Sequence, residues 1–266
     1  LQALAAIVAR ELVRFARQYG RLASAVVRPL LWLAVFAAGF RNVFGVAINE
    51  PYDTYIPYDV YIAPGLVGMV LLFNGMQGSL AMVYDREMGV MRLLLTAPLP
   101  RWWVLLARLV ATAVLSLAQA AVFVAVAALL GTVLPVWGPQ TPQVLAAAVA
   151  SALMLAALGL LLSVHIRQLE NFAGTMNFVI FPMYFISTAL YPLWKLEESG
   201  AAWVWRVAQV NPFTHAVEWM RFALYGKDAG WAPWIVCGTF VACFALAAWG
   251  YDPQRGFGRL VRRGGA

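Results

Sequence analysis

The charged side chains with the clearest chemical potential lie together in one internal stretch, residues 84–103. It falls between two long apolar runs and reads YDREMGVMRLLLTAPLPRWW, with charges at Asp85, Arg86, Glu87, Arg92 and Arg101. Carboxylates and guanidinium groups pair readily across a wet protein interface. Because Pro98 and Pro100 interrupt the stretch before a Trp pair, we expect a short helix along the inner membrane surface, where a soluble partner can bind it.

Catalytic and nucleotide-binding motifs are absent from the sequence. The only lysines, Lys195 and Lys227, lie outside any G-x-x-x-x-G-K-[ST] loop, and there is no G-x-S-x-G or H-E-x-x-H motif. The two histidines are isolated, and Cys237 and Cys243 sit inside an apolar run. We therefore predict a protein that is not an enzyme and that holds no metal or cofactor of its own.

The positions of the acidic residues also indicate which energy source the protein can use. Each of them falls at the end of an apolar run or in a loop. Proton-coupled carriers place Asp, Glu or His relays inside the membrane. The pattern argues against a proton-driven carrier, so the energy must come from a partner.

The composition is that of a polytopic membrane protein. The chain is 63% hydrophobic and only 12% charged, whereas soluble domains are about a quarter charged. The net charge is +7, but the arginines cluster at the ends of the apolar runs. This pattern indicates topology and lipid contact and not nucleic-acid binding.

The apolar runs predict an all-α fold with six transmembrane helices in a single domain, 23–251. The predicted spans are 23–44, 61–83, 104–134, 143–164, 171–190 and 231–251. Arg28 and Pro29 are expected near the inner end of the first span, where an arginine can reach the interface. Glycines in the second span, such as Gly75 and Gly78, allow neighbouring helices to approach closely.

Three further segments complete the expected organisation. Residues 1–22 form an amphipathic interfacial helix with four arginines on one face: Arg10, Arg14, Arg17 and Arg21. Residues 193–225, cut at Asn211 and Pro212, form two short Trp-rich helices that suit an interface or a re-entrant dip. Residues 252–266 are a basic tail. Fourteen of the nineteen Lys and Arg residues then fall on the inner side, which places both termini in the cytoplasm.

Four stretches together resemble the ABC type-2 permease family, the membrane subunits of ATP-binding-cassette exporters. They are YIAPGLVGM (61–69), YDREMGVMRLLLTAPLPRWWVLLAR (84–108), FPMYFISTALYPL (181–193) and NPFTHAVEWMRFALYG (211–226). They occur in the family's order and, with the span count, cover nearly the whole chain. One departure is that Ala107 and Arg108 stand where the family often has a lysine or a glycine-lysine pair.

The resemblance implies roles for the segments described above. Residues 84–100 would form the coupling helix that touches the ATPase, through Asp85, Arg86, Glu87, Gly89, Met91, Arg92, Leu94 and Thr96. The helix 1–22 would be the interface helix, and the two short helices in 193–225 would be the outer re-entrant pair.

The resemblance also implies partners, location and cargo. The chain would lie in the bacterial cytoplasmic (inner) membrane and work with a P-loop ATPase subunit, which binds ATP and Mg²⁺. A second permease, identical or a close paralogue, and membrane lipids complete the partners, with no nucleic acid. The cargo would be hydrophobic or amphipathic: a drug, a lipid or a glycan-lipid. An ion-gradient-driven carrier and a non-transporting assembly factor remain as alternatives.

One six-span bundle is too small to enclose a wide lumen, so the path is expected between two copies. Candidate lining residues recur at helical spacing in the second and fifth spans: Met69, Phe73, Met76, Phe172, Met176 and Met183. A Met-rich and aromatic face suits flexible apolar cargo. Ordinary helix packing and lipid contact explain the same spacing equally well.

Overall fold

The computed structural model describes residues 9, 13, 27–35, 51–52, 56–88, 100–132, 134–166, 168–198 and 202–251. Its helices with defined bounds are α3 (Tyr58–Glu87), α5 (Arg101–Leu129), α6 (Thr141–His165), α7 (Leu169–Phe185), α8 (Leu193–Glu198), α9 (Ala202–Val210), α10 (Pro212–Leu224) and α11 (Ala232–Gly250). Residues 27–35 are also helical. The predicted all-α class is confirmed for this part of the chain.

Within the described residues, four helices are long and apolar enough to cross a membrane. They cover Tyr58–Asp85, Trp102–Leu129, Thr141–His165 and Ala232–Gly250, which correspond to the predicted second, third, fourth and sixth spans. The predicted third span, 104–134, extends too far, because the chain leaves the helix at Gly131 with φ +98°. Glycine adopts this left-handed conformation without a steric penalty. The Thr132 amide then donates back to the Ala127 carbonyl.

The predicted first span lies mostly outside the described residues, and the predicted fifth span is longer than the helix found there. Only residues 27–35 of the first lie in the described part of the chain. The fifth, predicted as 171–190, ends as α7 at Phe185 after 17 residues, close to the minimum for a crossing. The Asn211 side chain explains this end, because its Nδ2 donates to the carbonyls of Met183 and Ile186 at 2.7 Å each. Its Oδ1 meanwhile accepts from the Phe213 amide, so one residue caps both α7 and α10.

The short helices before the last span also differ in part from expectation. The predicted piece 193–210 is divided into α8 and α9, with residues 199–201 outside the described part. The second piece is confirmed as α10, which begins at the predicted Asn211–Pro212 break. Pro at the first helical position is favourable because no partner is needed for its missing N–H.

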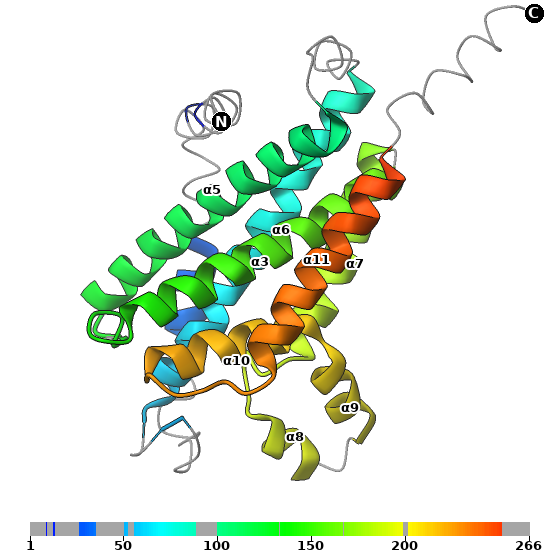
Figure 1. The fold of residues 1–266 in the computed structure, drawn as a ribbon. Coiled ribbons are helices and arrows are strands. Elements are labelled where there is room, and N and C mark those ends of the chain that lie inside the picture. Colours follow the sequence, from blue (N-terminus) through cyan, green and yellow to red (C-terminus); the bar gives the residue numbers. More distant parts are fainter. Residues whose placement is uncertain are drawn as a thin grey trace, which may run out of the picture.

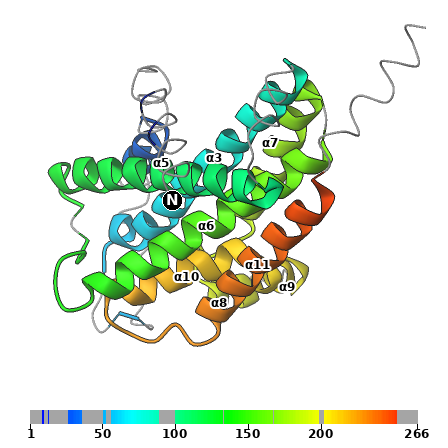
Figure 2. The same ribbon diagram turned by 45° about the horizontal axis from the view of Figure 1, so that its top comes forward.

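Helix α3 runs through the centre of the bundle, packed against α5, α6, α7 and α10, while α11 packs on α6 (Figures 1 and 2). At its crossing with α6, a Cβ added to Gly75 would lie 2.9 Å from the backbone of Leu155. A Cβ on Gly159, facing it, would lie 2.7 Å from the Gly75 carbonyl oxygen. The expected close approach at Gly75 is therefore confirmed, and it lets the two backbones pack directly.

The bundle has two distinct ends. At one end lie the C-termini of α3, α6 and α11 and the N-termini of α5 and α7. The short helices α8, α9 and α10 gather at the other end (Figure 1). Exposed tryptophans mark both: Trp102 and Trp249 at the first end, Trp137 and Trp231 at the second. Tryptophans concentrate at membrane interfaces. The 19 residues of α11 extend about 28 Å, close to the hydrocarbon thickness of about 30 Å.

Candidate functional site

The charge at the end of α3 is already paired inside the chain. The Asp85 carboxylate accepts a hydrogen bond from Arg108 Nη2 at 2.6 Å, and the two side chains are only 7% and 15% exposed. Arg108 lies in α5, so the pair joins the last turn of α3 to the first turns of α5. Removing one partner from such a buried pair leaves an uncompensated charge. Asp85 therefore links two helices and is not a freely accessible contact for a partner.

Glu87 makes a second link at the same end. Its Oε1 accepts from the Leu169 backbone amide at 2.9 Å, and Leu169 is the first residue of α7. A carboxylate at a helix N-terminus satisfies an unpaired N–H and complements the helix dipole. Met88, which follows, is 60% exposed. The end of α3, where the charged stretch 84–103 begins, is thus tied to the beginnings of α5 and α7.

The other predicted residues of the coupling stretch lie outside the described part of the chain: Gly89, Met91, Arg92, Leu94 and Thr96. The same holds for the Arg86 side chain and for the four arginines of the predicted interface helix, Arg10, Arg14, Arg17 and Arg21. Their roles stay predictions.

The candidate path residues occupy two environments. The side chains of Met69, Met76, Phe172 and Met176 are buried in the main apolar core of the single chain. Phe73 and Met183 are partly buried against that core. The more exposed face of α7 instead carries Phe178 and Phe181. Phe181 meets Phe73 edge-on, with ring centroids 6.3 Å apart, within the range of about 4.5–7 Å that aromatic pairs favour.

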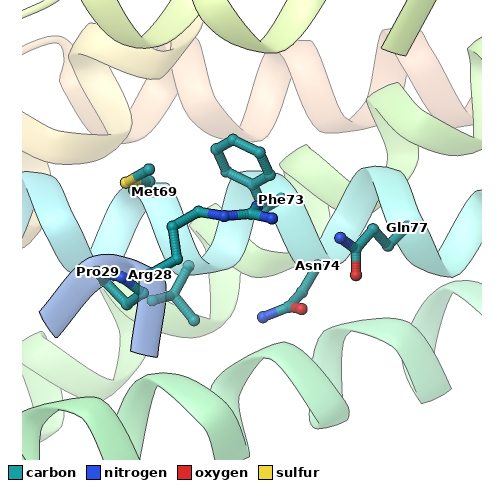
Figure 3. Close-up of a pocket in the computed structure, with 7 residues that line it drawn as sticks. Arg28, Pro29, Met69, Phe73, Asn74 and Gln77 are labelled. Carbon is teal, nitrogen blue, oxygen red and sulfur yellow. The ribbon is translucent and has the colours of Figure 1, made fainter. Parts of the chain in front are cut away.

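Met69 and Phe73 also line a small pocket where residues 27–35 lie against α3. Its other lining residues are Arg28, Pro29, Val70, Asn74 and Gln77. Figure 3 shows Arg28 reaching along α3 to Phe73, with the Asn74 and Gln77 amides farther along the same helix. The Arg28 Cζ lies 4.4 Å from the centroid of the Phe73 ring.

The depth of Arg28 differs from expectation. Its guanidinium lies beside Phe73, at the middle of α3, whereas the sequence suggested the inner end of the first span. A cation at this depth costs about 2.5–3.5 kcal/mol in a membrane. The cation–π contact with Phe73 offsets part of this, by about 1–2 kcal/mol. The pocket therefore places a charged side chain and two amides beside the middle of α3.

Comparison with known proteins decides the family. The family model described as ABC-2 type transporter matches residues 2–225, most of the chain. This chain belongs to the ABC-2 type transporter family. It is similar to the putative transport permease ycf38 of Pyropia yezoensis, with 28% identity over 94% of this chain and 80% of that protein. The corresponding ycf38 protein of Cyanophora paradoxa is 28% identical over 86% and 76%.

A further relative is the probable multidrug ABC transporter permease YbhR of Escherichia coli (strain K12). It is 25% identical over 69% of this chain and 48% of that protein. Family membership makes this chain a transport permease subunit, spanning the membrane several times, and not the nucleotide-binding part. It also implies a partnership with an ATP-binding subunit.

Sequence reasoning missed a buried charge cluster at the opposite end of this ABC-2 permease. Arg221 of α10 is 2% exposed. Its Nη1 donates to Glu218, its Nη2 donates to the Thr188 carbonyl at 2.8 Å, and its guanidinium lies 4.1 Å from the Tyr61 ring centroid. The only sequence signal was a Glu and an Arg three residues apart on a helix whose other face is apolar.

Tyr52 packs over the same cluster. Its ring contacts those of Tyr61 and Tyr225, with centroids 6.1 and 5.0 Å away. Burial raises the pKa of Tyr52 above its ordinary value, although Arg221 acts in the opposite direction. Tyr52 is therefore neutral at physiological pH, and Glu218 supplies the negative charge that balances Arg221. The cluster fastens α10 to α3 and to the segment after α7.

Proposed function

We propose that this permease forms, with a second permease copy or a close paralogue, an export pathway for a hydrophobic or amphipathic substrate such as a drug, a lipid or a glycan-lipid. ATP hydrolysis in separate ATPase subunits drives it. In this proposal the chain has six spans, an N-terminal interface helix and short outer helices, and lies in a bacterial cytoplasmic membrane with both termini in the cytoplasm.

The observation that carries the proposal is the convergence of three helices where the charged stretch begins. Asp85 binds Arg108 of α5, and Glu87 binds the first amide of α7. A force applied to residues 89–99 by a soluble partner acts on α3, α5 and α7 together. These are helices that must separate or tilt if a pathway opens between two copies. The relative named a multidrug transporter permease supports amphipathic cargo.

The test is transport by inside-out membrane vesicles that contain the permease and its ATPase. We expect a fluorescent amphipathic dye or labelled lipid to accumulate when Mg-ATP is added, and to continue accumulating when an ionophore collapses ion gradients. Substituting the Walker A lysine of the ATPase should abolish accumulation. Transport that persists without ATP and collapses with the ionophore would overturn the proposal in favour of a secondary carrier.

A further inference from the structure

The Arg28 pocket combines one cation, two amides and an apolar wall at the middle of α3. Its polar side is formed by Arg28, Asn74 and Gln77, and its apolar side by Met69, Val70 and Phe73. Asn74 is 9% exposed. These side chains come from one face of α3 and from the facing segment 27–35. Packing holds that segment in place, because its Pro29 and Leu33 are buried against the bundle, while the Arg28 side chain is exposed.

No carboxylate of the described residues neutralises Arg28. The ion pairs there join Arg108 to Asp85 and Arg221 to Glu218, and no acidic residue lines the pocket. Charged groups inside a membrane normally pair with an opposite charge or mark a ligand pathway. The contact with Phe73 attracts the cation without neutralising it, so a negative charge brought by a ligand would be stabilised here.

We propose that this pocket binds the anionic headgroup of an amphipathic molecule, whose apolar chain lies along Met69, Val70 and Phe73. Arg28 provides the charge, and the Asn74 and Gln77 amides can donate to headgroup oxygens. A neutral amphiphile lacks the group that Arg28 recognises, and a free anion lacks the chain that the apolar wall receives. This inference deepens the proposed function and rests on it for the assignment of the ligand as cargo.

The binding test uses the purified full chain in phosphatidylcholine nanodiscs, without ATPase. Saturable binding of dodecyl phosphate is compared with that of dodecanol and of inorganic phosphate by native mass spectrometry and thermal shift. We expect dodecyl phosphate to bind at least about tenfold more tightly than either probe. Arg28→Gln should weaken its binding by at least about tenfold, and Arg28→Lys by less, because the charge is kept.

Two controls keep this test decisive. Arg206→Gln, an exposed arginine of α9, should leave dodecyl phosphate binding unchanged. If Arg28→Gln does not fold, Asn74→Leu and Gln77→Leu replace it, with an expected weakening of about three- to tenfold. Equal binding by wild type and the Arg28→Gln variant, or by dodecyl phosphate and dodecanol, would overturn the proposal. Equally tight inorganic phosphate would overturn the amphiphile assignment.

A second arm separates a transported amphiphile from a resident membrane lipid. The assembled permease–ATPase complex is loaded with dodecyl phosphate and supplied with Mg-ATP. Loss of occupancy during turnover identifies cargo, and constant occupancy identifies a resident anionic lipid; the site stands in both cases. If the complex shows no ATP-driven transport, the proposed function fails, while the binding arm still reports on the pocket.

Discussion

Replacing Glu218 with leucine is expected to lower the free energy of unfolding by about 3–5 kcal/mol, because Arg221 is then left as a buried cation without a counter-charge. Arg221→Met should cost less, about 1–3 kcal/mol, because it chiefly leaves the Thr188 carbonyl without its donor. The larger loss of stability is thus expected from replacing the more exposed residue, since the Glu218 side chain is 23% exposed and that of Arg221 only 2%. Unfolding in mixed micelles, followed by circular dichroism, measures the difference.

The double variant Glu218→Leu/Arg221→Met tests the cause. Replacing both members of a buried pair with apolar residues is often nearly neutral, so the double variant should recover most of the stability lost by Glu218→Leu. Glu197→Leu, at an exposed residue of α8, serves as the matched control and should change stability by less than about 0.5 kcal/mol. A Glu218→Leu variant no less stable than this control would show that Arg221 does not depend on Glu218.

The second large effect is expected at the Asp85–Arg108 pair. Asp85→Ala should reduce transport by more than about tenfold while ATP hydrolysis by the assembled complex continues, because α3 and α5 no longer move as one unit. Transport and hydrolysis are measured in the same proteoliposomes. The charge-swapped variant Asp85→Arg/Arg108→Asp should restore part of the transport, since an opposite pair is re-formed.

Glu170 provides the control for this prediction. It is an exposed acid in the first turn of α7, at the same end of the bundle, so Glu170→Gln should leave transport within about twofold of wild type. If Asp85→Ala transports as well as the Glu170→Gln variant, the pair is structural and does not carry force between helices.

The long helices were predictable because their signal is local. Helix α6 spans Thr141–His165 against a prediction of 143–164, since a continuous apolar run between a Pro-containing turn and a polar joint defines both ends. The start of α10 was equally clear from Asn211 and Pro212. The end of α7 was not, because it depends on hydrogen bonds from Asn211, a residue 25 positions away in sequence from Ile186.

The candidate functional site was only partly predictable from the sequence, because its contacts join residues that are far apart in the chain. The sequence identified the charged stretch but not that Asp85 and Arg108 would meet, or that Glu87 would cap α7. Arg221 is one of the five Lys and Arg residues that the predicted topology leaves on the outer side, and nothing local in the sequence reports that Tyr61 and Thr188 surround it. A Met-rich helix face is compatible with a core and with a pathway alike, and Met76 and Phe172 lie in the core of the single chain.

The central claim, that a separate ATPase drives this permease from the end where α3 stops, can be tested by cross-linking from both ends. Met88→Cys and Trp137→Cys occupy exposed positions at opposite ends, each in a chain whose Cys237 and Cys243 are replaced by serine. A reagent joining cysteine to amines is applied to the assembled complex. The account predicts that Met88→Cys cross-links to the ATPase and Trp137→Cys does not. Cross-linking from Trp137→Cys, with none from Met88→Cys, would contradict it.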